Sequence, residues 1–366
     1  MRCIILGLLC ASAGVARAAD EGASPAAAAP STSAATSATD AAANASVERL
    51  LAALTKEDSY KVRLQAAVLL GRIGDERAVQ PLIDAVNSDP HYTVRGAAAT
   101  ALANRKETRA IAPILKRLAV DPEPFVREAA GKALASFERQ VALPYIVTSF
   151  NSSDARVRKE AITYIALEPS ALVDPVLAKG LGDVPEIAEI AGDAVRKLPP
   201  GEMLRFLEGA LENREPGVRR GAIHMLHKLG SAEATQLVLR VYERDIEEDD
   251  VKSAARIALR ELRNHLPLEQ IQRDAASSVE KHTRVRALRL LGVAGGAEAE
   301  KTLLAALQDD DPYIRGNAVM ALGELGDPAL VPALEKLMDD PSNQRILHLV
   351  RHTLKQLRSQ RDQSVR

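Results

Sequence analysis

The chain has 366 residues, of which 48 are Lys or Arg and 49 are Asp or Glu, so its formal net charge is -1. Nucleic-acid-binding domains usually carry a clear basic excess, and this near balance therefore argues against a nucleic-acid partner. Aromatic residues make up only 3% of the chain, and its two cysteines are Cys3 and Cys10, so we expect a core of aliphatic side chains without a disulfide framework.

Residues 1–18 have the pattern of a secretory signal peptide. Arg2 supplies the positive start, and Ile4 to Val15 is an apolar run that is too short to span a bilayer as a helix. Ala16-Arg17-Ala18 fits the small-x-small cleavage site, so we expect cleavage before Ala19 and a periplasmic or secreted mature protein. The alternative is that the apolar run is an ordinary buried helix.

A lipoprotein signal at Cys10 is disfavoured, because Gly7 stands where such signals have leucine and Leu9 stands where they have a small residue. Cys3 and Cys10 would both leave with the signal peptide. The mature chain is then expected to have no disulfide, no nucleophilic thiol and no thiolate metal ligand.

Residues 19–46 consist mainly of Ala, Ser, Thr and Pro and carry few charges. The stretch offers no large apolar side chain to bury, so we predict a disordered tether. Its alanines favour helix, but Pro25, Pro30 and the Ser and Thr residues oppose it.

A repeat extends over residues 47–358. An apolar residue or threonine followed by a basic residue recurs about every 31 positions, with one double gap that the degenerate pair Ile187-Ala188 fills. Small or apolar residues recur four, five and eight places after the anchors, which puts them on one face of a helix. A last degenerate unit starts near Ile346. The regular anchors are Val62-Arg63, Val94-Arg95, Val126-Arg127, Val157-Arg158, Val218-Arg219, Val251-Lys252, Thr283-Arg284 and Ile314-Arg315.

Residues 309–338 show the repeat most clearly. A polar turn precedes a predicted helix over Ile314 to Leu325, which Gly326 ends because glycine tolerates the left-handed conformation found just past helix ends. Asp327 can cap a second apolar helix over Leu330 to Leu337. Two such short helices cannot bury their apolar faces alone, so each pair needs neighbours of the same kind.

The pattern D-P-x-V-R-x-x-A-A-x-A-L-G-x-L-G-D, followed by A-V-P-x-L, resembles the HEAT repeat in the short bacterial form named after phycobilisome lyases. It is clearest over Asp121 to Leu134 and Asp311 to Leu334. The resemblance covers about residues 47–358 and implies an all-α, right-handed α-α superhelical solenoid of about ten HEAT-like helix pairs. It also implies that the second helices line the concave side. Family members serve mainly as interaction scaffolds, with a few enzymes among them.

One repeat position is an arginine in most units, directly after the anchor. Aspartates lie in the turns before these arginines, and the arginine fork suits carboxylates and turn carbonyls, so we predict a structural ladder that ties unit to unit. The alternative is an anion-binding row. The predicted ladder consists of Arg63, Arg95, Arg127, Arg158, Arg219, Arg284 and Arg315 with Asp89, Asp121 and Asp311.

Positions two, six and nine after each anchor are expected to face outward on the second helix. They are small toward both ends of the array and charged in the middle, with Glu189 and Asp193 as acidic exceptions. We hypothesise a basic patch on the concave face that binds an acidic segment of a protein partner; the alternative is a solvated polar face. The patch residues are Lys159, Arg196, Arg220, His224, His227, Arg260 and Arg289.

Two histidine pairs have helical spacing, His224 with His227 and His348 with His352. Two ligands do not make a metal site, and the His-Glu dipeptides that mark the iron-dependent hydroxylases of the HEAT family are absent, so no metal and no cofactor are expected. The acidic run over residues 245–250 suits a helix N-terminus and lacks the spacing of a calcium loop.

The sequence contains no phosphate-binding glycine loop, nucleophile elbow or H-E-x-x-H motif, so we do not expect an enzyme. We predict an exported, non-catalytic protein-binding scaffold or adaptor that is monomeric, lacks a membrane span in its mature form and ends in a polar tail over residues 359–366. The alternatives are an accessory or assembly factor that cradles a client protein and, as in the phycobilisome branch, a tetrapyrrole (bilin) lyase or isomerase.

Overall fold

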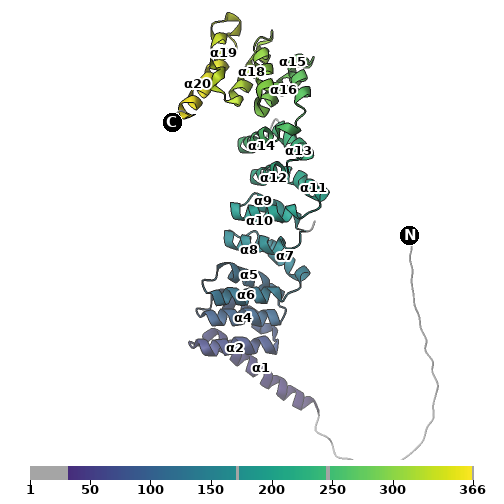
Figure 1. Ribbon diagram of the computed structural model, residues 1–366. Coiled ribbons are helices and arrows are strands. Elements are labelled where there is room, and N and C mark those ends of the chain that lie inside the picture. The colour runs from purple at the N-terminus through teal and green to yellow at the C-terminus, as the bar shows by residue number, and fades with distance from the viewer. Residues whose placement is uncertain (1–31, 170–172, 245–247, 365–366) are drawn as a thin grey trace, which may run out of the picture.

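The computed structural model describes residues 32–169, 173–244 and 248–364. Over these ranges the chain forms twenty α-helices without a strand, and consecutive helices make ten pairs that stack in a column. Figure 1 shows the column, from which the C-terminal pairs turn away. The predicted all-α solenoid of about ten helix pairs is confirmed. The predicted signal peptide with both cysteines, and residues 245–247 of the acidic run, lie outside the described ranges.

The first helices of the ten pairs are α1 (Thr32–Lys56), α3 (Val79–Ser88), α5 (Ile111–Val120), α7 (Arg139–Ser149), α9 (Asp174–Leu181), α11 (Pro200–Leu211), α13 (Ala232–Tyr242), α15 (Leu268–Ser277), α17 (Ala297–Ala306) and α19 (Val331–Glu335). The second helices are α2 (Tyr60–Ile73), α4 (Tyr92–Asn104), α6 (Pro124–Ala135), α8 (Ala155–Ile165), α10 (Pro185–Arg196), α12 (Pro216–Leu229), α14 (Asp249–Glu261), α16 (Lys281–Ala294), α18 (Pro312–Leu325) and α20 (Leu347–Ser364). Short 3-10 turns are η1 (Glu76–Ala78), η2 (Thr108–Ala110), η3 (Arg263–His265), η4 (Pro328–Leu330), η5 (Lys336–Met338) and η6 (Pro341–Asn343).

The helix ends follow local sequence chemistry, as α18 illustrates. The carboxylate of Asp311 accepts a hydrogen bond from the backbone N–H of Tyr313 at 2.8 Å, and Pro312 occupies the first helical turn, where its missing N–H costs nothing. Gly326 ends the helix with a φ of 73°, the left-handed conformation that glycine adopts without strain. The predicted end of this helix at Leu325 is confirmed, whereas the helix begins at Pro312, two residues before the predicted start.

Two predicted boundaries are wrong at the ends of the array. Helix α1 begins at Thr32, inside the stretch 19–46 that was expected to be a disordered tether, because alanine has the highest helix propensity and the helix continues into residues that pack on the core. Helix α20 continues to Ser364, through most of the predicted tail over residues 359–366. No Pro or Gly follows Pro341 in the sequence, so nothing there stops the helix.

Successive second helices usually pack on one another, but α8 packs on α5 and α12 packs on α9. The backbones of α9 and α12 meet because glycines line both sides of their contact. A Cβ atom at Gly182 would lie 2.6 Å from the backbone nitrogen of Val218, and one at Gly221 would overlap the carbonyl oxygen of Leu181. The stack is therefore offset between α10 and α12.

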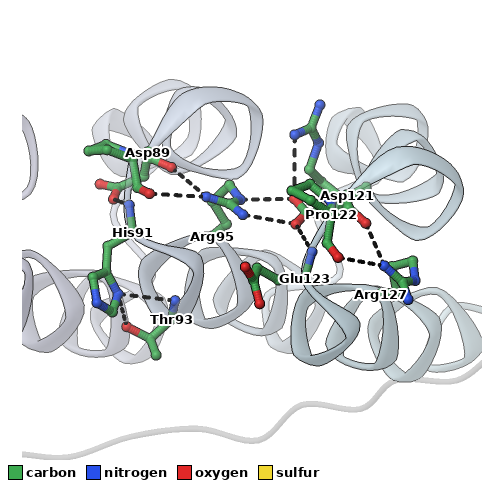
Figure 2. Close-up of polar contacts among 10 residues, drawn as sticks. Asp89, His91, Thr93, Arg95, Asp121, Pro122, Glu123 and Arg127 are labelled. Carbon is green, nitrogen blue, oxygen red and sulfur yellow. Dashed lines mark hydrogen bonds and ion pairs between the residues drawn. The ribbon is translucent and has the colours of Figure 1, made fainter.

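Arg95 shows how one unit is joined to the next (Figure 2). Its Nε and Nη2 atoms donate to the two carboxylate oxygens of Asp121, each at 2.8 Å, and Asp121 lies in the turn of the following unit. Its Nη1 atom donates to the carbonyl oxygen of Asp89, in the turn of its own unit, at 2.9 Å. One guanidinium thus fixes two successive turns and the helix that carries it.

The other ladder arginines repeat this arrangement with variations. Each pairs with a side chain from the turn of the following unit, whereas carbonyl oxygens come mostly from its own turn. Arg127 differs, since its described contacts are the carbonyl oxygens of Asp121 and Pro122. Asp311 is not a partner of a ladder arginine, because it caps α18 and pairs with Lys281. The side-chain pairs are Arg63–Asp89, Arg95–Asp121, Arg158–Asp183, Arg219–Glu248, Arg284–Asp309 and Arg315–Asn343.

The carboxylate of Asp121 has no solvent-exposed surface, and the guanidinium side chain of Arg95 is 10% exposed. Burial alone would raise the pKa of Asp121, but the hydrogen bonds from Arg95 and from the backbone N–H of Glu123 lower it further than burial raises it. The pKa of Asp183 is likewise lowered, chiefly by its hydrogen bonds from Arg158. These carboxylates are therefore ionised in the folded array.

We predict that Asp121→Ala lowers the free energy of unfolding by about 3 kcal/mol at pH 7, because it leaves the Arg95 guanidinium buried without its carboxylate. The folded pKa of Asp121 lies below its unfolded value of about 3.9, so the stabilisation is present above that value and is lost as the pH falls through the folded pKa. Urea titrations at pH 7 and pH 3 measure both effects, and the difference between wild type and variant should shrink at pH 3. The exposed Asp310→Ala is the matched control; an equal loss in both variants would contradict the prediction.

Candidate functional site

The contact between α14 and α16 departs from the repeat. The fifth position after the anchor is small or apolar in the other second helices from α2 to α18, but α14 has Arg256 there, with a half-buried side chain. A guanidinium cannot be buried without partners, so α14 and α16 do not pack on each other through aliphatic side chains at this position. The corresponding residues elsewhere are Ala67, Ala99, Ile223, Leu288 and Val319.

A groove of about 920 Å³ opens at this contact. It is lined by the end of α13, the first two turns of α14, the first two turns of α16 and the start of α18. Five of the lining residues are Lys or Arg and two are acidic, so the groove is basic although the whole chain is nearly neutral. The N-terminal ends of α14 and α16 add positive potential. The lining residues are Tyr242, Glu243, Arg244, Asp249, Lys252, Arg256, His282, Val285, Arg286, Arg289 and Tyr313.

Carboxylates from other units hold three of these arginines. Arg244 pairs with Glu212 of the preceding unit. Arg286 pairs with Glu243 at 2.6 Å, and Arg256 pairs through Nη1 with Oε1 of Glu324 in α18 at 2.5 Å. Arg289 differs, because its described contact is a hydrogen bond of 3.3 Å from Nε to the amide oxygen of Asn317. Among the described residues no carboxylate pairs with Arg289, which leaves most of its donors available to a ligand.

Tyr242 lies at the wall of this groove. Burial raises the pKa of its phenol, and the charge of Glu324 adds to the effect, whereas Arg256 and Arg289 oppose it. The phenol therefore stays protonated at neutral pH and can donate a hydrogen bond beside the two guanidiniums. Phenol and guanidinium donors together suit a ligand that presents carboxylate oxygens.

The seven residues of the predicted basic patch lie on five successive second helices, from α8 to α16, but they do not form one site. Arg289 lines the α14/α16 groove. Arg196, Arg220 and His224 line a separate groove of about 470 Å³ between α10 and α12, at the offset described above. Lys159, His227 and Arg260 line neither groove.

Most of these cations already have acidic partners. Lys159 pairs with Glu186 at 2.7 Å and Arg220 pairs with Asp250 at 2.8 Å. In both pairs the acid belongs to the following unit, because the acids recur with the same period as the cations. The patch prediction considered the second helices one by one and therefore missed this compensation.

Arg196, His227 and Arg260 are also engaged. Arg196 pairs with Asp193 one turn earlier, and His227 lies 3.1 Å from a carboxylate oxygen of Glu261. Arg260 donates to the carbonyl oxygen of Glu324 at 2.9 Å. Burial lowers the pKa of His224, with further contributions from neighbouring cations, so this imidazole is neutral at pH 7.

Several groove residues were missed from the sequence, namely Tyr242, Lys252, Arg256, His282, Arg286 and Tyr313. One signal was available, since Arg256 occupies a repeat position that is otherwise small or apolar. A charged residue at a core position marks a place where the stack must open. The other residues face the groove only because it opens.

The described part of the chain contains no group of three or more His, Cys, Asp or Glu that could hold a metal ion. His348 and His352 lie together on α20 without further candidate ligands. None of the helices in the described ranges is both long and apolar enough to cross a bilayer.

The family model for HEAT repeats matches five overlapping segments, residues 47–135, 81–168, 111–196, 175–260 and 271–355. The chain belongs to the HEAT repeat family. All residues that line the α14/α16 groove lie within the matched segments 175–260 and 271–355. A search of curated proteins gave no match.

Solved structures of other solenoids are similar to this HEAT array at low identity. Kap121p bound to Ste12p is 16% identical with a TM-score of 0.40, over 89% of this chain and 43% of that chain. Kap121p bound to Nup53p is 15% identical with a TM-score of 0.37, over 85% and 41%. Human deoxyhypusine hydroxylase in complex with glycerol is 17% identical with a TM-score of 0.28, over 79% and 98%. The chain thus spans less than half the length of the Kap121p chains.

We predict that the double variant Arg256→Leu with Glu324→Gln is more stable than the wild-type HEAT array by about 1 kcal/mol. Replacing a partly buried ion pair by an apolar residue is often neutral or stabilising. Leucine at position 256 would restore the apolar packing between second helices that other units have. Thermal unfolding followed by circular dichroism measures the change. Arg315→Leu is the contrast, since it removes the donors to two turns and should cost at least about 2 kcal/mol. A destabilised double variant would contradict the assignment of Arg256 as a departure from the core pattern.

Proposed function

We propose that this HEAT-repeat protein is a non-catalytic protein-binding scaffold, and that the α14/α16 groove holds an acidic segment of its partner. The observation that carries the proposal is the groove itself, in which five Lys or Arg residues face two acids in a volume of about 920 Å³. A basic groove of this kind attracts an acidic chain and raises its association rate.

The form of the groove favours an extended polypeptide segment over a small compact ligand. Its lining comes from α13, α14, α16 and α18, so it crosses three successive units. Arginine side chains bind carboxylates through paired hydrogen bonds, whereas Tyr313, which is half exposed, offers aromatic surface to the rest of a peptide. The overall charge of -1 does not support a nucleic-acid partner.

We also propose that the scaffold is exported and acts as a monomeric adaptor in the periplasm or outside the cell. The support is the sequence pattern of residues 1–18, with its apolar run and the Ala16-Arg17-Ala18 cleavage site. Export would separate the folded array from both cysteines, so its stability would rest on packing and on the arginine ladder.

We expect a labelled oligoglutamate peptide to bind the purified protein, as measured by fluorescence anisotropy, and we expect affinity to fall as salt is added. Arg286→Glu with Arg289→Glu should weaken binding at least about tenfold, since two charge-assisted contacts become repulsive. Arg205→Glu with Arg351→Glu, at exposed sites on α11 and α20, makes the same change of charge outside the groove and should bind nearly as wild type does.

Equal affinities of the groove variant and the control variant would contradict the proposal. Circular dichroism of each variant shows whether the fold is intact. If the double Arg→Glu variant unfolds, Arg286→Gln with Arg289→Gln, which removes the two charges without reversing them, replaces it in the test. An oligolysine peptide of the same length should not bind.

Export predicts that a tagged full-length chain, expressed in a bacterium and recovered from the periplasm, begins at Ala19. N-terminal sequencing and intact mass measure this directly. Arg2→Glu, which removes the positive start, should reduce recovery from the periplasm. A full-length chain that stays in the cytoplasm with residues 1–18 attached would contradict export.

A further inference from the structure

The Arg256–Glu324 pair differs from the ladder pairs in its reach. Glu324 lies near the end of α18, two units beyond α14, and α16 lies between the two helices in the stack. Arg260, one turn after Arg256, donates to the backbone carbonyl of the same Glu324 at 2.9 Å. Two arginines of α14 are therefore held by one residue of α18, beside the groove that α14 and α16 form.

This pair is also much more accessible than a ladder pair. The side chains of Arg256 and Glu324 are 37% and 39% exposed, whereas those of Arg95 and Asp121 are 10% and 0% exposed. Exposed ion pairs are weak and exchange readily with solvent or with another charged group. Arg256 contacts Glu324 and also lines the groove. A carboxylate that enters the groove can therefore reach the same guanidinium.

We propose that Arg256 is a carboxylate-binding position of the groove, and that Glu324 occupies it until an acidic side chain of the partner takes its place. The inference rests on the proposed function, because the incoming carboxylate belongs to the acidic segment. Arg289, which lacks a described carboxylate partner, is the position that the segment engages without displacing an internal acid. Glu324 thus acts as an internal competitor that lowers the affinity for acidic chains.

Exchange has a structural consequence. While Glu324 holds Arg256, this ion pair joins α14 to α18 across α16. Once a partner carboxylate replaces Glu324, this ion pair is lost, and the hydrogen bond from Arg260 to the Glu324 carbonyl oxygen still joins the two helices. The partner would then loosen the connection between α14 and α18 beside the groove that receives it.

The test compares the binding of labelled oligoglutamate by wild type, Glu324→Gln and Glu335→Gln. Glu335 pairs with Arg358 at 2.6 Å at a similarly exposed site on α19 and α20, so its variant makes the same change in net charge without affecting the groove. Competition predicts that Glu324→Gln binds about three to ten times more tightly than wild type. Glu335→Gln should bind as wild type does, apart from the small effect of one charge.

The outcomes separate this inference from the proposed function. If wild type binds the peptide and Glu324→Gln binds equally or more weakly, the competitor role is overturned and the binding groove stands. If both single variants gain affinity equally, net charge is the cause and the competitor role is again overturned. If neither wild type nor Glu324→Gln binds, both the groove and the competitor fail. Arg256→Gln should remove the gain that Glu324→Gln gives, because the competed guanidinium is then absent.

Discussion

The stack depends on one repeated interaction, a guanidinium that joins the turn of its own unit to the turn of the next. Helix pairs with faces of Ala, Leu, Val and Ile would adhere in many relative positions, since apolar contacts are not directional. Arginine adds direction, because its planar fork meets a carboxylate and turn carbonyls in one geometry. The Arg95–Asp121 pair shows this most completely, with an acid that has lost all contact with water.

The candidate sites occur where the regular pattern is interrupted. Between α10 and α12 the interruption is a backbone contact, in which Gly182 and Gly221 let α12 settle on α9 and leave a groove beside it. Between α14 and α16 it is Arg256, at a position that the other units up to α18 fill with a small or apolar residue. In both places a departure from the repeated packing leaves accessible surface, which fits the general observation that binding sites cost some stability.

The fold was predictable because it is encoded locally and repeated. The Val-Arg anchors, the helix-ending glycine at Gly326 and the cap at Asp311 set units and boundaries without reference to distant residues. The site was less predictable, since it depends on contacts between units. Whether Arg220 is an available cation is decided by Asp250, 30 positions later, and the second-helix pattern alone does not show that pairing. The helix that begins at Thr32 was missed because composition was given more weight than the continuity of α1 into packed residues.

The ladder also gives the array a polarity. Most units present an arginine toward the unit that follows and a turn side chain toward the unit that precedes, so units of this kind can follow one another. If such a unit were gained or lost by unequal recombination, the remaining arginines would still meet turn partners, and the protein could change length during evolution without redesign of these interfaces. The row is interrupted where Ala188 and Lys252 hold the arginine position, and at the C-terminal end Arg315 meets Asn343, a neutral amide, where earlier units supply an acid.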